Sequence, residues 1–226
     1  METDLKRKWI RAGLFGAVCL LVMVLAIFVF RKPALKITAR GGRALTPAVE
    51  IPQFNLLDHQ GLPFNNDSLK GNWTLSMTGF TYCPDVCPTT LSKMAAFLTK
   101  LEAMPGNNRA PRFVFLSVDP FRDTVEELSR YVAYFHKDFI GVTGTPEGIN
   151  QLVTGLGLYY VYTDQDDDHF LDDVLHKPAK EDYGVVHSSR VLFISPQAEL
   201  VAVLSQPYEA DDVLALFTQL RAYYGD

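Results

Sequence analysis

The chain has 226 residues, of which 48% are hydrophobic, and a formal net charge of −5 at pH 7. Residues 1–45 hold nine Lys and Arg against two Asp and Glu, so the rest of the chain carries a net charge of about −12, which argues against nucleic acid as a partner. Of the three cysteines, Cys19 lies in an apolar N-terminal run, and the other two are too few for a small scaffold held by disulfides.

The N-terminal part of the chain predicts a membrane anchor. Residues 12–30 carry no charge and are almost wholly apolar, and about 20 such residues in a helix cross a bilayer. We therefore predict a short tail over residues 1–11 and a single transmembrane helix over residues 12–30. A cleaved signal peptide is the alternative, but its apolar region is shorter and ends in small residues. Basic residues flank the run on both sides, so charge does not decide its orientation.

Residues 31–48 contain a Gly-Gly pair and two prolines without apolar periodicity, a composition that predicts a linker. Residues 49–226 are numerous enough for one domain with its own core. Strand and helix patterns alternate through this domain. The predicted strands cover residues 73–80, 113–118, 139–142, 159–162, 191–194 and 200–204, and the predicted helices cover residues 88–101, 124–135, 145–156 and 211–223. A β-α-β half followed by a β-β-α half, with an acidic insertion at residues 164–173, predicts a thioredoxin-like α/β domain.

The segment Gly79–Pro88 (GFTYCPDVCP) places Cys83 and Cys87 four residues apart, where a predicted strand meets a predicted helix. This spacing brings both sulfurs to one side, and a helix N-terminus lowers the pKa of a nearby thiol. Thiolates are soft ligands that favour Cu(I). The pair is one residue wider than the usual redox C-x-x-C motif, which makes room for a metal. A disulfide, or two small residues packed in a core, are the alternatives.

Three further residues are candidates for the same site. His187, in the stretch YGVVHSSR just before a predicted strand, is the candidate third ligand, because a Cys2His set can hold either Cu(I) or Cu(II). Asp119 ends the strand at residues 113–118 and is expected to lie behind the ligands, with capping of the next helix as the alternative. Asp85, inside the cysteine loop, is expected to cap the helix or to provide charge for partner docking.

On three motifs the sequence resembles the Sco/SenC family of copper proteins. They are GFTYCPDVCP at residues 79–88, SVDP at residues 117–120, and YGVVHS at residues 183–188. The resemblance implies that Cys83, Cys87 and His187 bind copper in a thioredoxin-like domain. It implies a single-pass protein of the inner (cytoplasmic) membrane, with the domain in the periplasm or an equivalent compartment. Val186 stands where the family commonly has Asp, which predicts a loosely oriented His187.

The function that this resemblance implies is a copper metallochaperone for the copper-A centre of cytochrome c oxidase. Its expected partners are the copper-bearing oxidase subunit, the membrane through residues 12–30, and another copper chaperone. The alternative is a thiol-disulfide reductase that keeps the oxidase cysteines reduced, with Cys83 and Cys87 as the redox pair. The metallochaperone needs His187 and the reductase does not. Copper-linked redox sensing is a third hypothesis, which the sequence neither supports nor excludes.

Overall fold

The computed structural model describes residues 15–17, 19–23, 35, 37–105, 109–164, 169–171 and 173–225. The chain forms two compact units, residues 1–36 and residues 37–226. In the first unit, residues 15–17 and 19–23 are helical. Among the described residues, no helix combines the length and the apolar character that crossing a membrane requires. Most of the predicted anchor at residues 12–30 lies outside the described residues.

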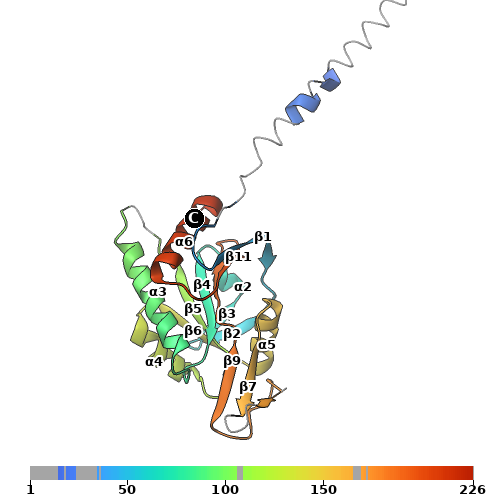
Figure 1. Ribbon diagram of the computed structural model, residues 1–226. Helices are drawn as coiled ribbons and strands as arrows, with labels where there is room; N and C mark the ends of the chain where they lie inside the picture. Colours follow the sequence, from blue (N-terminus) through green and yellow to red (C-terminus); the bar gives the residue numbers. More distant parts are fainter. Residues whose placement is uncertain are drawn as a thin grey trace, which may run out of the picture. The chain divides into compact units, whose positions relative to one another are not determined.

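The second unit is built on an eight-stranded sheet with the order β1-β11-β10-β4-β5-β6-β2-β3 (Figure 1). Its strands are β1 (Gly42–Glu50), β2 (Asn55–Asp58), β3 (Pro63–Asn65), β4 (Thr74–Gly79), β5 (Arg112–Ser117), β6 (Phe139–Thr143), β10 (Val191–Ile194) and β11 (Glu199–Leu204). The central strands β4, β5 and β6 are parallel, and the other pairs are antiparallel. A second sheet, ordered β8-β7-β9, consists of β7 (Tyr160–Asp164), β8 (His169–Leu171) and β9 (Tyr183–His187).

Helices cover both faces of the large sheet. They are α2 (Asn66–Leu69), α3 (Val86–Glu102), α4 (Val125–Phe135), α5 (Pro146–Gly155) and α6 (Ala210–Tyr224). Figure 1 shows α3, α4 and α6 gathered on one side and α5 on the other. Two of these helices begin at a capping threonine: Thr124 accepts a hydrogen bond from the N–H of Glu127, and Thr145 accepts one from the N–H of Gly148.

The alternation of side chains along β5 explains its continuous apolar sequence. Val114 and Leu116 join the core cluster that contains Ile149 of α5. On the opposite face, the Phe115 ring lies 5.4 Å from the ring of Tyr131 of α4. A parallel strand covered by helices on both faces reads as an unbroken hydrophobic run.

All the strands and helices predicted within the domain are present, each with its ends shifted by no more than two residues. The linker prediction was wrong over residues 42–48, because these residues belong to β1. This strand pairs with β11, with Ala44 opposite Ala202, and Leu45 packs against the core. The Gly-Gly pair and Pro47 suggested a tether, but proline is compatible with an edge strand. The register of β1 shifts between Ala44 and Val49, the interval that contains Pro47.

The pairing of β1 predicts where a stable soluble domain must begin. A chain starting at Ile37 keeps β1, whereas one starting at Val49 leaves residues 202–204 of β11 without their β1 partners. Each lost hydrogen bond removes about 0.5–1.5 kcal/mol, so we expect the shorter chain to unfold with a free energy lower by about 2–5 kcal/mol. Urea unfolding of both chains measures the difference. Equal midpoints and slopes would show that β1 contributes nothing to the fold.

Candidate metal centre

The cysteine loop connects the end of β4 to the start of α3, and Gly79 makes room for it. A Cβ atom at Gly79 would lie 2.5 Å from the ring of Phe115 and 2.9 Å from Sγ of Cys87. Both distances are shorter than real Cβ contacts, so a larger residue would displace the sulfur or the ring. Glycine is required here because the backbone passes so close to the thiol.

The sulfur of Cys83 acts as an acceptor at the start of α3. The helix begins at Val86, two residues earlier than predicted, so Cys87 lies in its first turn. Sγ of Cys83 accepts the backbone N–H of Cys87 at 3.5 Å. Asp85 occupies the N-cap position, but its exposed carboxylate accepts instead from the Thr89 hydroxyl, at 3.5 Å. The helix dipole stabilises a negatively charged acceptor at the helix N-terminus.

The two thiols differ in exposure and in pKa. Cys83 is half-buried and Cys87 is buried. The hydrogen bond from the thiol of Cys87, helped by His187 and by the backbone N–H groups of Cys87 and Asp85, lowers the pKa of Cys83 to about 3. The same hydrogen bond, together with burial, raises the pKa of Cys87. At neutral pH the pair therefore consists of one accessible thiolate and one buried thiol.

The imidazole of His187 directs its Nε2 edge toward Cys87. Its Nδ1 lies 3.0 Å from the backbone carbonyl of Ser188. A carbonyl oxygen only accepts, so Nδ1 is the donor of this hydrogen bond. Nε2 lies 3.9 Å from Sγ of Cys87. The hydroxyl of Thr78 donates to the same carbonyl at 2.7 Å, and the ring of Phe80 meets the imidazole edge-on at 5.8 Å.

The valine before the histidine does not leave the imidazole without support. Val186 stands where a carboxylate was expected, and a backbone carbonyl supplies the acceptor instead. Ser188 is itself held in place, since its N–H donates to the Tyr159 carbonyl at 3.0 Å and its hydroxyl accepts the Tyr159 N–H at 3.1 Å. The orientation of His187 is therefore set by backbone groups, contrary to the loose orientation predicted from Val186.

The donor set of Cys83, Cys87 and His187 fits a soft metal ion. Two ligands at about 2.3 Å (sulfur) and about 2.0 Å (nitrogen) from one ion in trigonal geometry lie roughly 3.7 Å apart, close to the separation of Cys87 and His187. Within the described part of the chain, no three His, Cys, Asp or Glu side chains are gathered tightly enough to hold an ion as they stand.

Asp119 lies behind the site, but its carboxylate bonds to residues other than the ligands. Oδ2 accepts from Nε of Arg122 at 2.5 Å, and Oδ1 accepts from the hydroxyl of Tyr183 at 2.6 Å. The alternative role as a helix cap is wrong, because Thr124 caps α4. Asp119 thus connects the loop after β5 to the start of β9, the strand that ends at His187.

Sequence reasoning missed Asp123, a buried carboxylate under the cysteine loop. It accepts hydrogen bonds from the N–H of Thr81 at 3.0 Å, the Thr81 hydroxyl at 2.6 Å and the Ser117 hydroxyl at 2.6 Å. Burial raises the pKa of Asp123 to about 6, although these hydrogen bonds lower it. The sequence did offer a signal for Asp123, because it is the second acidic residue in the turn after β5 that holds Asp119. Loop residues that follow strands often carry functional side chains.

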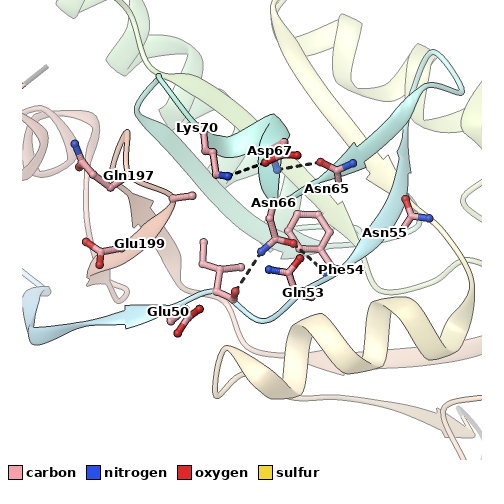
Figure 2. Close-up of a pocket in the computed structure, with 12 residues that line it drawn as sticks. Glu50, Gln53, Phe54, Asn55, Asn65, Asn66, Asp67, Lys70, Gln197 and Glu199 are labelled. Atoms are coloured by element: carbon pink, nitrogen blue, oxygen red, sulfur yellow. Dashed lines mark hydrogen bonds and ion pairs between the residues drawn. The ribbon is translucent and has the colours of Figure 1, made fainter.

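A cavity of about 580 Å³ lies apart from these residues, between β1, α2 and the turn before β11 (Figure 2). Its polar side chains bond mainly to one another and to the backbone. Lys70 pairs with Asp67 at 2.7 Å, and the amide of Asn66 donates to the carbonyl of Ile51 at 3.2 Å. Neither cysteine nor His187 lines this cavity, so its size does not indicate the site.

Fold and site together define a thioredoxin-like protein with two thiols after a central strand and an imidazole beside them. Residues 43–221 match the sequence profile of the SCO1/SenC family. The chain belongs to this family, as the three motifs predicted.

Two relatives, one named for copper binding and one named as a SCO1 homolog, match this domain. A protein of Stutzerimonas stutzeri named for copper binding is 34% identical over 174 residues, covering 75% of this chain and 76% of its own length. The mitochondrial SCO1 homolog 1 of Arabidopsis thaliana is 34% identical over 171 residues, covering 75% of this chain. The match spans only 47% of that relative's length.

Solved structures share the fold. Arabidopsis thaliana ScoI with copper bound is 33% identical, with a TM-score of 0.65, and covers 76% of this chain and 98% of its own. Yeast Sco1 with copper bound is 25% identical, with a TM-score of 0.67, and covers 78% of this chain and 90% of its own. The predicted thioredoxin-like α/β class is confirmed.

The raised pKa of Asp123 predicts a pH-dependent cost to stability. Its pKa is about 6 in the folded protein and about 3.9 in an unfolded chain, so the folded state holds the proton more tightly. The free energy of unfolding should fall as pH rises from about 4 through 6. The cost, up to about 3 kcal/mol, should be fully present above about pH 7.

Asp123→Asn removes this ionisation, so its stability relative to wild type should increase from pH 4.5 to pH 7.5. Urea unfolding of reduced, metal-free protein at both pH values measures the change. Asp138→Asn, at a side chain that is 63% exposed, controls for the loss of a carboxylate. A difference between Asp123→Asn and wild type that stays constant with pH would contradict the expected titration.

Proposed function

We propose that this protein is a copper-binding assembly factor that carries the ion to the copper-A centre of cytochrome c oxidase. The observation that carries the proposal is the imidazole of His187, whose Nδ1 donates to the Ser188 carbonyl and whose Nε2 lies 3.9 Å from Sγ of Cys87. A dithiol that only exchanges disulfides needs no such nitrogen. Two thiolates and one imidazole make a set that suits both copper oxidation states.

Membership of the SCO1/SenC family supports copper as the cargo and the oxidase as the recipient. One relative is named for copper binding, and two solved relatives hold copper. The expected partners are the copper-bearing oxidase subunit and another copper chaperone that loads the site. The acidic domain is compatible with a basic protein surface and argues against nucleic acid.

The different protonation of the two cysteines suits stepwise loading of the ion. The thiolate of Cys83 is available at neutral pH, because hydrogen bonds hold its pKa at about 3. The thiol of Cys87, whose pKa is raised, must lose its proton when the metal binds, since thiolate is the ligand. His187 would contribute Nε2, because its Nδ1 is occupied by the Ser188 carbonyl.

A thiol-disulfide reductase is the second candidate, and the same difference in pKa supports it. The Cys83 thiolate would attack a partner disulfide, forming a mixed disulfide and releasing one partner thiolate. Cys87, after losing its proton, would attack the sulfur of Cys83 and release the second partner thiolate. The partner gains two electrons, and Cys83 and Cys87 end as a disulfide.

We propose that residues 12–30 anchor the protein as a single transmembrane helix, with the domain in the periplasm or an equivalent compartment. The support is the uncharged run of 19 residues with basic residues on both flanks. Single-pass anchoring keeps the copper site near a membrane-bound recipient.

Copper binding by variants of the reduced domain 37–226 tests the site. Cys83→Ala or Cys87→Ala should weaken Cu(I) by more than about 100-fold, since loss of an outer-shell partner alone costs 10–100-fold. His187→Ala should weaken Cu(II) by roughly 100-fold and Cu(I) by less than about tenfold, because Cu(II) favours nitrogen ligands. Anaerobic titration against competing chelators, with absorption spectroscopy, measures both affinities and the expected single copper per chain.

His176→Ala is the matched control, because His176 is exposed and bonds to Asp173. It should change neither affinity. In cells, His187→Ala should assemble little oxidase while the purified variant still reduces a test disulfide, and Cys83→Ala should lose both activities. Normal oxidase in His187→Ala cells, beside none in Cys83→Ala cells, would replace copper delivery with the reductase function.

The anchor is tested by intact-mass measurement of protein extracted from membranes. We expect a mass that includes residues 12–30, because the run lacks the small residues of a cleavage site. Release of the protein by alkaline carbonate should fail, as it does for spanning helices. A mature species that starts after Phe30 would overturn the anchor.

A further inference from the structure

Arg122 lies in the turn between β5 and α4 and contacts both the loop that carries Cys83 and the strand that carries His187. Only 13% of its side chain is exposed, although it carries a full charge. A charged side chain is buried at this depth only where its partners compensate for lost water. Those partners come from the cysteine loop, from its own turn and from β9.

The first set of contacts ties the turn to β9. Nε of Arg122 donates to Oδ2 of Asp119, and Nη1 donates to the backbone carbonyl of Tyr183 at 3.0 Å. The hydroxyl of Tyr183 completes a closed ring of bonds by donating to the other oxygen of Asp119. Tyr183 is the first residue of β9 and His187 is the last. The ring of bonds therefore fixes the strand that carries the histidine.

The second set of contacts ties the same guanidinium to the cysteine loop. Its central carbon lies 3.7 Å from the ring centre of Tyr183, 4.9 Å from that of Tyr82 and 5.9 Å from that of Phe80. Tyr82 directly precedes Cys83, and the ring of Phe80 packs edge-on against His187. The planar cation thus lies between an aromatic ring of the loop and one of β9, an arrangement that the ammonium of lysine cannot reproduce.

The remaining nitrogen, Nη2, is buried and finds no hydrogen-bond partner among the described residues. An unpaired buried donor costs stability, so an apolar side chain would join the two segments at lower cost. Stability alone therefore does not explain an arginine at this position. Its N–H donors and its flat guanidinium face hold the cysteine loop and β9 in one orientation, and this explains it better.

We propose that Arg122 is a positioning residue that holds His187 against the cysteine loop and so sets the ratio of the Cu(II) affinity to the Cu(I) affinity of the site. The inference rests on the proposed copper function. Cu(II) depends on the imidazole, whereas two thiolates alone can hold Cu(I). A change that loosens β9 from the cysteine loop therefore weakens Cu(II) binding more than Cu(I) binding.

Arg122→Lys tests this while keeping the charge. It should weaken Cu(II) about tenfold and Cu(I) less than threefold, and the electron paramagnetic resonance spectrum of Cu(II) should lose its nitrogen coupling in part. Arg130→Lys is the matched control, because Arg130 is 65% exposed and pairs with glutamates of its own helix. This variant should change the affinity for neither ion. In metal-free Arg122→Lys, backbone amides of Tyr183–His187 should exchange hydrogen faster.

A double-mutant cycle with His187→Ala separates positioning from a general loss of structure. In the His187→Ala background, Arg122→Lys should weaken Cu(II) no further, because its effect passes through the histidine. Equal weakening of both ions, or full additivity in the cycle, would overturn the proposal. Tyr183→Phe, which removes only the hydroxyl bond to Asp119, is the milder variant if Arg122→Lys does not fold, and it should shift the Cu(II) to Cu(I) ratio in the same direction.

These outcomes also separate this inference from the proposed function. If wild-type protein binds copper without any dependence on His187, the metal centre itself is wrong. If wild-type protein depends on His187 and Arg122→Lys leaves the ratio of the two affinities unchanged, only the role of Arg122 is wrong.

Discussion

The parallel pairing of β4 with β5 is the constraint on which the site depends. Gly79 lies opposite Ser117 at the last position of this pairing, and the N–H of Val118 donates to the Gly79 carbonyl at 2.9 Å. Both strands therefore end at the same edge of the sheet, where ligand sites form in open α/β folds. The cysteine loop and the turn that contains Asp123 meet there, and the bonds from Thr81 and Ser117 to that carboxylate follow from this meeting.

The edge concentrates negative charge, and each anion has a separate means of support. Arg122 pairs with Asp119, while hydroxyl and amide donors from Thr81 and Ser117 satisfy Asp123. The Cys83 thiolate accepts a backbone N–H from the first turn of α3. Because these supports come from different segments, changing one of them should disturb one anion before it disturbs the others.

The regular elements and the residues of the candidate site could be located from the sequence, because both depend on local patterns, while metal binding by these residues stays a prediction. Apolar runs marked β4 and β5, helical spacing marked α3, and the cysteine motif marked the loop. The pairing of β1 with β11 could not be predicted, since it joins residues about 150 positions apart and its sequence resembles a linker. The contacts of Arg122 and Asp123 could not be predicted for the same reason. Their roles come from contacts with Tyr183 and Thr81, which only the folded chain brings near.

The backbone carbonyl behind His187 also fixes the charge around a bound ion. Two thiolates and a neutral imidazole leave a net charge of −1 around Cu(I) and of zero around Cu(II). A carboxylate in that position would add one more negative charge and increase the basicity of the ligand, which would hold either cation more strongly. The carbonyl of Ser188 bonds to Nδ1 at 3.0 Å, and it can neither titrate nor be removed by a side-chain substitution. A copper carrier would gain from such an arrangement, because the imidazole keeps its orientation while the electrostatic barrier to handing on an ion stays low.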